Sequence, residues 1–296
     1  MSPHGYLKIS IAAAVATICL KMGAWWLTDS IGFLSDALES FVNLAGATFA
    51  LVMVTLARTP ADRDHPFGHG KAEYFSAGFE GILIFVAAIA ILITSVERLI
   101  HPVELENFGS GTVLSILSTV INYLVARMLM SASGRLRSMA LEADAKHLMT
   151  DVWTTVGVIA GVGLAMLTQT WWLDPVVAIA VAINILREGG SLVRRAFDGL
   201  MDKTLPPEEV DHLNDLLVKF CDKDCELGQL RTRGAGPQRF AYLEVRVAGH
   251  MSVDAAHDLV DRMEKTVLDE TGIILNTHVE PRHDTRRASP ADAPGT

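Results

Sequence analysis

The chain has 296 residues, half of them apolar, and a net charge of −9 from 25 Lys and Arg against 34 Asp and Glu. Its mean hydropathy of +0.31 is too high for a wholly water-soluble protein. The composition excludes a disordered chain, a collagen-like fibre, a disulfide-rich secreted scaffold and a nucleic-acid-binding protein. Because acidic residues are densest after residue 200, we expect a membrane part followed by a water-soluble acidic domain.

Six apolar stretches are predicted to cross a bilayer as helices. The longest stretches without Asp, Glu, Lys or Arg are 40–57, 107–126 and 152–173, and each reaches the roughly 18 residues that a span requires. Three shorter runs extend to full spans if one or two charged residues are tolerated. None of the runs shows the alternation of barrel strands, so helices are the expected spanning form. The expected helices cover residues 7–28, 31–57, 75–99, 109–131, 140–168 and 171–190.

The Lys and Arg residues between these spans predict the orientation. With the N-terminus inside, basic residues gather in the inner segments, and the outer loops hold Arg98 alone. The first apolar run is expected to be retained as a helix, because no small-residue cleavage site of a signal peptide follows it. The chain is therefore predicted to be a multi-pass protein of the inner (cytoplasmic) membrane, with both termini in the cytosol.

The part after the spans is predicted to be a small cytosolic α+β domain of order αββαβ. Alternation of apolar and polar residues predicts its strands, and proline, serine and glycine mark the ends of its helices. The expected elements are a helix from Pro206 to about Cys221, strands 228–234 and 239–247, a helix from Ser252 to Thr271, and a strand 273–280. The expected domains are a six-helix transmembrane domain over 1–203, a metal-binding and dimerisation domain over 204–283, and a disordered tail over 284–296.

Two of the expected spans carry polar side chains on one helical face. An ionisable residue at the centre of a membrane helix costs about 2.5–3.5 kcal/mol, so its presence suggests a function. Asp36, Glu39 and Asn43 follow i, i+3, i+7 spacing, and His147 and Asp151 follow i, i+4 spacing. Oxygen atoms from one helix and an imidazole and a carboxylate from the other can together bind a divalent cation. Four such ligands in tetrahedral geometry are suited to zinc. The alternative is structural hydrogen bonding between helices.

A second group of candidate ligands lies in the loop between the second and third spans. Asp62, His65 and His69 are close enough in sequence to bind one metal ion. A solvated loop without a metal is the alternative interpretation.

A third group lies in the predicted cytosolic domain. His278 and Glu280 point to one face of the last strand, and Glu244 and His257 can reach the same place; ordinary surface charge is the alternative. Cys221-x-x-x-Cys225 offers half of a thiolate site. With only Cys19 besides, the cysteines imply no disulfide framework and a reducing compartment.

Four stretches resemble the cation diffusion facilitator family of divalent-metal transporters. They are SDALESFVN (35–43), DHPFGHGKAE (64–73), the His147-x-x-x-Asp151 pair and THVEP (277–281). Their order, spacing and predicted side of the membrane agree with the family, and the resemblance covers roughly residues 5–283.

This resemblance implies a homodimer that moves divalent metal out of the cytosol by proton-coupled alternating access. The transport site of the family falls here on Glu39, Asn43, His147 and Asp151, and Asp36 is a candidate additional ligand. Zinc-transporting members commonly have Asp or His followed by Asp on the second span. Because Glu39 and Asn43 occupy these positions, manganese, iron, cobalt and cadmium are candidate substrates as well as zinc.

The resemblance also assigns the loop site and a regulatory site in the cytosolic domain. The loop site maps onto Asp62, His65 and His69, and the cytosolic site onto Glu244, His257, His278 and Glu280. One histidine that relatives often have is replaced by Gly228-Gln229, which leaves the number of cytosolic ions open. Lys71 and Asp202 are expected to pair across the dimer.

Two other classes of protein are weighed against a transporter. An intramembrane metallohydrolase also needs His and carboxylates in helices, but the chain has no His-Glu-x-x-His motif and is not expected to be an enzyme. A non-transporting metal sensor or scaffold would keep the cytosolic metal sites but would not need the usual ligand pair on the second span. Glu39 and Asn43 differ from that usual pair, which is why this class is considered.

Overall fold

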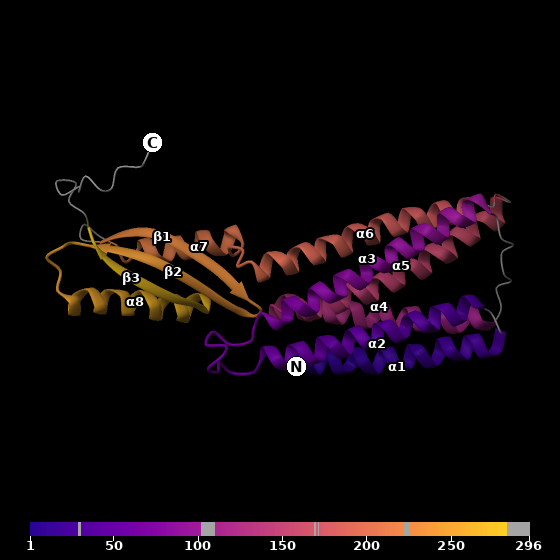
Figure 1. Ribbon diagram of the computed structural model, residues 1–296, viewed down its shortest axis with the longest axis horizontal. Coiled ribbons are helices and arrows are strands. Elements are labelled where there is room, and N and C mark those ends of the chain that lie inside the picture. The colour runs from indigo at the N-terminus through magenta and orange to yellow at the C-terminus, as the bar shows by residue number, and fades with distance from the viewer. Residues whose placement is uncertain (29–30, 102–109, 169, 171, 222–224, 283–296) are drawn as a thin grey trace. The chain divides into compact units, whose positions relative to one another are not determined.

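The computed structural model describes residues 1–28, 31–101, 110–168, 170, 172–221 and 225–282, without the side chains of 28, 31–36, 38, 39, 42, 110–112, 158, 159, 161–167 and 174. The chain divides into two compact units, Met1–Leu200 and Met201–Thr296. The first unit is helical and the second contains a sheet (Figure 1).

Six long helices form the first unit, as predicted. They are α1 (Pro3–Thr28), α2 (Ile31–Ala57), α3 (Ala72–Ile100), α4 (Ser110–Leu136), α5 (Met139–Thr168) and α6 (Leu173–Leu200). By length and composition, four stretches of the described residues can cross a membrane: Pro3–Leu27, Ala72–Ile100, Val113–Leu136 and Pro175–Leu200. In α2 the corresponding stretch is the shorter Asn43–Ala57. The helical membrane fold is therefore confirmed.

Helix α6 is longer than predicted, because its last turns are amphipathic rather than uniformly apolar. Leu192 and Ala196 are buried on one side of it. Arg195 lies on another side and pairs with Glu142 of α5, with Nη2 2.7 Å from Oε1. The charged residues after position 186 therefore continue the helix instead of ending it.

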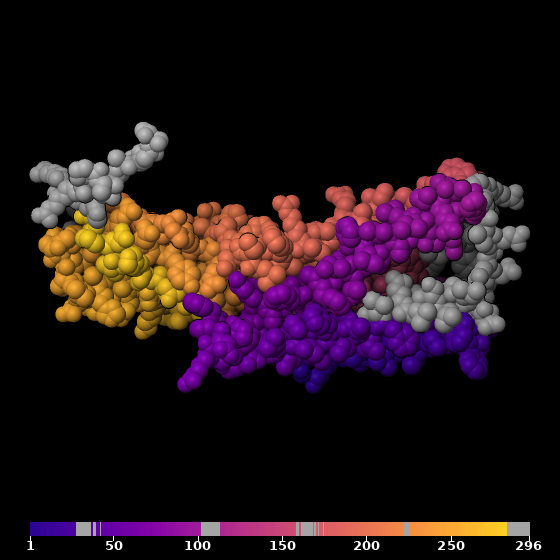
Figure 2. Space-filling model, in the orientation of Figure 1, coloured from indigo at the N-terminus to yellow at the C-terminus, as the bar shows by residue number. Residues whose placement is uncertain are grey.

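Helices α3 and α6 approach each other closely at two glycines. A Cβ atom added to Gly81 would lie 3.0 Å from the backbone N of Val193, and one added to Gly189 would lie 3.0 Å from the backbone N of Phe85. Any larger residue would force the backbones apart, as is typical of small residues at membrane-helix contacts. The space-filling view shows these two helices side by side (Figure 2).

The outer surface of the helical unit is apolar. Large apolar side chains project from α3 and α4 without burial inside the chain, among them Ile82, Val86, Ile93, Leu117 and Leu124. In water such a surface would be unfavourable, whereas hydrocarbon tails accommodate it. The exposed residues therefore agree with a bilayer around this unit.

The second unit has the predicted αββαβ order. Its elements are α7 (Pro207–Val218), β1 (Cys225–Ala235), β2 (Gln238–Val247), α8 (Val253–Thr271) and β3 (Ile273–Pro281). The sheet order is β1-β2-β3, with β1 antiparallel and β3 parallel to β2. Helix α8 makes the crossover that a parallel pair requires. Ser252 caps its start, with Oγ accepting from the Ala255 N–H at 3.1 Å, and Gly272 caps its end in a left-handed conformation with φ 69°.

One face of this sheet forms the core. Leu243 and Val245 of β2 are buried with Leu217 of α7 and with Leu259 and Met263 of α8. Strand β1 starts three residues earlier than predicted and has an irregular register between Leu227 and Leu230. The irregularity lies at Gly228 and Gln229, where the alternating pattern is interrupted.

The cysteines of the second unit differ from the expectation. Cys221 and Cys225 form a disulfide in this structure. The sequence-based interpretation of two free thiols available to a metal is therefore wrong for this form of the chain.

Candidate metal-ion sites

A buried polar cluster joins α2, α4 and α5 inside the helical unit. Asn43 and Asp151 are each 5% exposed and His147 is 6% exposed. The Asn43 amide donates to Asp151 Oδ2, and its oxygen lies 2.5 Å from His147 Nε2. Asn122 of α4 also donates to Asp151 Oδ2, at 3.3 Å. The structure thus brings together three of the four predicted transport ligands.

Two buried carboxylates extend this cluster toward α3. Glu80 of α3 is 1% exposed, and its Oε2 lies 3.2 Å from His147 Nδ1. Asp144, one turn before His147 on α5, is 2% exposed. Neither carboxylate pairs with a Lys or Arg among the described residues, and both Glu80 oxygens and Asp144 Oδ2 lack a hydrogen-bond donor there. Buried charge without a counterion is costly, so this region is suited to a cation.

Sequence reasoning assigned no role to Glu80 or Asn122. For Glu80 a usable signal existed, since it is a carboxylate inside an apolar span and carries the same insertion cost as Asp151. Asn122 is a single amide on α4 with no periodic partner, and no sequence pattern distinguishes it from an ordinary interhelical hydrogen-bonding group.

The remaining predicted transport residues lie on α2. Glu39 precedes Asn43 by one helical turn, and Asp36 precedes Glu39 by three residues. The side chains of both residues lie outside the described part of the chain. Their roles as ligands therefore stay predictions.

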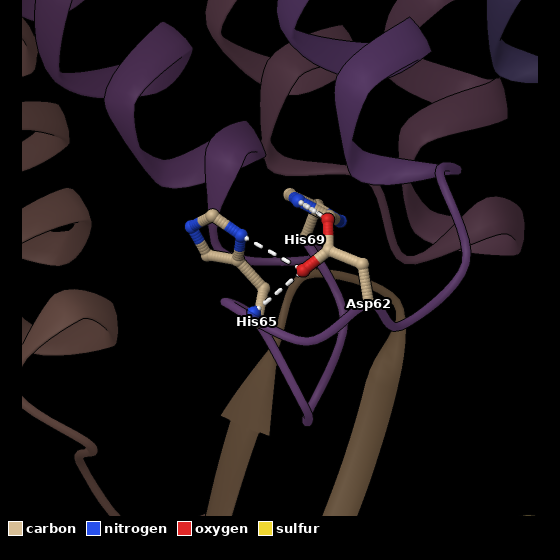
Figure 3. Close-up of side chains that lie close together, drawn as sticks. All are labelled: Asp62, His65 and His69. Atoms are coloured by element: carbon tan, nitrogen blue, oxygen red, sulfur yellow. Dashed lines mark hydrogen bonds and ion pairs between the residues drawn. The ribbon is translucent and has the colours of Figure 1, made fainter.

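The loop between α2 and α3 gathers three ligand-type side chains. Suitable atoms of Asp62, His65 and His69 all lie within 4.8 Å of one another (Figure 3). Asp62 Oδ1 is 3.3 Å from His65 Nδ1, and Asp62 Oδ2 is 3.4 Å from His69 Nε2. Among the described residues, this is the one group of three or more His, Cys, Asp or Glu side chains with such closely spaced ligand atoms.

Backbone groups hold this loop in shape. Asp62 Oδ1 accepts from the N–H groups of His65 at 2.7 Å and Asp64 at 3.0 Å. The bond from the His65 N–H is the main reason that the pKa of the Asp62 carboxyl lies below its ordinary value. His69 Nδ1 lies 3.3 Å from the Thr59 carbonyl. With a proton on Nδ1, His69 donates to that carbonyl and leaves Nε2 available as a ligand, the usual arrangement of a metal-binding histidine.

The four predicted cytosolic ligands divide between the two faces of the sheet. Glu244 and His278 are register partners on β2 and β3, and His278 Nε2 lies 3.5 Å from Glu280 Oε1. Alternation along the strands puts these three residues on the face opposite the core. His257 lies on α8, which covers the core face, and its Nε2 is 3.6 Å from Asp261 Oδ2. One chain therefore does not gather all four residues around a single ion.

The two residues expected to pair across the dimer each have a partner within their own unit. Lys71 Nζ donates to the Leu200 carbonyl at 3.2 Å. Asp202 Oδ1 accepts from Arg233 Nη1 at 3.3 Å. Pairing of Lys71 with Asp202 of a second copy stays a prediction.

Comparison with known proteins agrees with both units. Residues 7–201 match the family model described as the cation efflux transmembrane domain, and residues 205–282 match the cation efflux protein, cytoplasmic domain. The chain is 46% identical over 282 residues to the uncharacterized transporter sll1263 of Synechocystis sp., covering 95% of this chain and 91% of that protein. It is 28% identical over 270 residues to the cation-efflux pump FieF of Citrobacter koseri, covering 88% of each. FieF of Salmonella choleraesuis is 29% identical over 271 residues, covering 88% of this chain and 87% of that protein.

Proposed function

The chain belongs to the cation diffusion facilitator family of membrane transporters, and we propose that it exports divalent transition-metal cations from the cytosol in exchange for protons. Zinc is the foremost substrate, with manganese, iron, cobalt and cadmium as the other candidates. The observation that carries this proposal is the buried cluster around His147 and Asp151, which also contains Glu80 and Asp144, two buried carboxylates that pair with no Lys or Arg among the described residues. Such a cluster inside an apolar helical unit is suited to binding a cation.

The ligand set that we propose is Glu39, Asn43, His147 and Asp151, with Asp36 as a candidate fifth residue. The contacts of Asn43 support this set, because its amide already spans the distance between His147 and Asp151. An ion that replaces those hydrogen bonds would bind the Asn43 oxygen, His147 Nε2 and Asp151 Oδ2 at once. A neutral amide is a hard oxygen ligand, which weakens strict selectivity for zinc.

Proton exchange follows from the chemistry of these ligands. His147 must be neutral at Nε2 and Asp151 ionised to bind a metal, so proton and metal binding exclude each other. In the proposed cycle, the inward-open state binds the metal with deprotonated ligands. After the bundle changes to the outward-open state, external protons take the ligand atoms and the metal leaves.

The second unit is proposed to dimerise the protein and to regulate it. Its match to the cation efflux cytoplasmic domain supports this role. Glu244, His278 and Glu280 lie on one face of the sheet. A metal ion bound there by residues of two protomers would favour the dimer. His257, which lies on the other side of the sheet, would reach that ion from the second protomer. A metal ion that binds one conformation of the protein more tightly than another shifts the protein toward that conformation. The loop ligands Asp62, His65 and His69 form a second candidate site, separate from the buried cluster.

Metal-dependent proton flux in proteoliposomes tests the function. Zn²⁺, Mn²⁺, Fe²⁺, Co²⁺ and Cd²⁺ are compared for the native chain and for Asp151→Ala. Flux with at least one metal, abolished by the substitution, supports proton-coupled export and ranks the substrates. The absence of flux with every metal in well-folded protein would overturn the proposal and favour a metal sensor or scaffold, the alternative that the neutral Asn43 brings into consideration.

A further inference from the structure

We propose that Glu80 is a positioning residue for the transport site, which holds the His147 imidazole so that Nε2 faces the cation. Glu80 also contributes the negative charge that Asn43 does not supply. This inference deepens the proposed function and rests on it for the identity of the ligand, a divalent transition-metal cation.

The first support is the contact between the Glu80 carboxylate and the Nδ1 atom of His147, neither of which has a hydrogen bond to another described residue. Glu80 Oε2 lies 3.2 Å from His147 Nδ1. Both Glu80 oxygens and His147 Nδ1 are buried without a hydrogen-bond partner among the described residues. Since a buried polar atom without a partner is costly, an N–H on Nδ1 directed at this carboxylate satisfies both groups.

The direction of the ring follows from this contact. In this structure the Asn43 oxygen accepts from the N–H of Nε2, because the Asn43 amide N–H donates to Asp151. A cation that replaces this hydrogen bond needs the lone pair of Nε2, and a proton on Nδ1 directed at Glu80 leaves that lone pair available. A histidine that binds a metal usually donates its other ring N–H to a carboxylate or carbonyl, which fixes the ring and its tautomer. Glu80 occupies the position of that carboxylate.

The second support is the space that α2 leaves for Glu80. A Cβ atom added to Gly46 would lie 2.6 Å from Glu80 Oε1 and 3.1 Å from its Cδ. Gly46 lies three residues after Asn43, on the same side of α2. Alanine at this position would displace the carboxylate, so the glycine permits Glu80 to reach His147.

The third support is the balance of charge. A divalent cation in a buried site needs compensating negative charge, because desolvation of the ion is costly. Asn43 is neutral, and Glu80 lies in contact with a proposed ligand while making no pair with a described Lys or Arg. A carboxylate at position 80 therefore supplies charge where an acidic residue at position 43 would otherwise do so.

The test measures Co²⁺ and Zn²⁺ affinity of the purified full-length chain, together with the visible spectrum of bound Co²⁺, which reports on its ligands. Glu80→Ala should weaken binding at the buried site about 10- to 100-fold, the range typical of residues that support a metal ligand. Glu80→Gln keeps an acceptor oxygen for Nδ1 and should bind better than Glu80→Ala. Gly46→Ala, which leaves Glu80 itself unchanged, should weaken binding as well.

Matched controls lie elsewhere on the helices. Glu188→Gln removes an exposed carboxylate that pairs with Lys146, and Gly190→Ala adds a methyl group where nothing lies within 4 Å. Both should bind Co²⁺ as the native chain does.

A double-mutant cycle separates positioning from a general structural effect. In a His147→Ala background, Glu80→Ala should weaken Co²⁺ binding clearly less than it does in the native chain, because the residue that it positions is gone and only the loss of its charge remains. Native affinity in folded Glu80→Ala and Gly46→Ala proteins would overturn the inference, as would an equal loss with and without His147. If Glu80→Ala does not fold, Gly46→Ala decides the question. Because the readout is binding, a native chain that binds metal without transporting it would refute the proposed function alone.

Discussion

Replacement of Asp151 by two different residues separates its role as a ligand from its role in the fold. Asp151 Oδ2 accepts from the amides of Asn43 and Asn122. Asp151→Leu leaves both amide donors buried and unpaired, at about 1–3 kcal/mol each, or about 2–6 kcal/mol of unfolding free energy in total. Asp151→Asn keeps an acceptor oxygen of the same shape. It also removes a charge from a region where Glu80 lacks a described basic partner, so the metal-free stability should be equal or higher.

The effect on metal binding should be the reverse of the effect on stability. Loss of a buried charged partner costs about 2–5 kcal/mol, which is a decrease in affinity of about 30-fold to about 5,000-fold. Thermal unfolding of the metal-free protein in detergent gives the stability, and radioactive zinc uptake into inverted vesicles gives transport. We expect Asp151→Asn to be stable and inactive, and Asp151→Leu to be unstable and inactive. Asp151→Asn protein that transports zinc at the native rate and apparent affinity would refute the assignment of Asp151 as a ligand.

Three further predictions concern the loop, the helix contact and the dimer. Because the pKa of Asp62 lies below its ordinary value, its carboxylate stays ionised between pH 7 and pH 5.5. Asp62→Asn should therefore lower metal affinity, measured by isothermal titration calorimetry, by a similar factor at both pH values. A steep pH dependence of the Asp62→Asn effect would contradict this. Gly189→Leu should destabilise the helical unit by about 1–3 kcal/mol through overpacking against α3, and native thermal stability would show that the close approach is not needed. Lys71→Glu or Asp202→Lys should weaken the dimer in analytical ultracentrifugation, with recovery in the double exchange, and dimerisation unchanged by either substitution would argue against the pairing.

The centre of the buried polar cluster could be predicted from sequence because helix geometry and insertion cost act together. His147 and Asp151 are one turn apart, so they share a face in any helix. The contribution of α3 and α4 could not be predicted in the same way. Glu80 and Asn122 are single polar residues on their helices, and which face of each helix meets α5 depends on packing between residues far apart in the sequence.

The cytosolic domain shows a similar division. Strand alternation predicted the order of its elements and put His278 and Glu280 on one face. It did not determine which face α8 would cover, so the sequence could not show that His257 and His278 lie on opposite sides of the sheet. The ends of α6 and β1 were less predictable because an amphipathic turn continues α6 and an irregular register interrupts β1.

The glycine contact between α3 and α6 has a consequence for motion during transport. Glu80 immediately precedes Gly81, one of the two glycines at which the backbones of α3 and α6 approach each other closely. With no side chain between the two backbones at that point, close packing restricts relative displacement of α3 and α6, and the Glu80 carboxylate is attached beside this contact. Tilting of α5 against this pair must therefore change the separation of Glu80 from His147. A spectroscopic distance between labels on α3 and α5 would follow the opening and closing of the site directly.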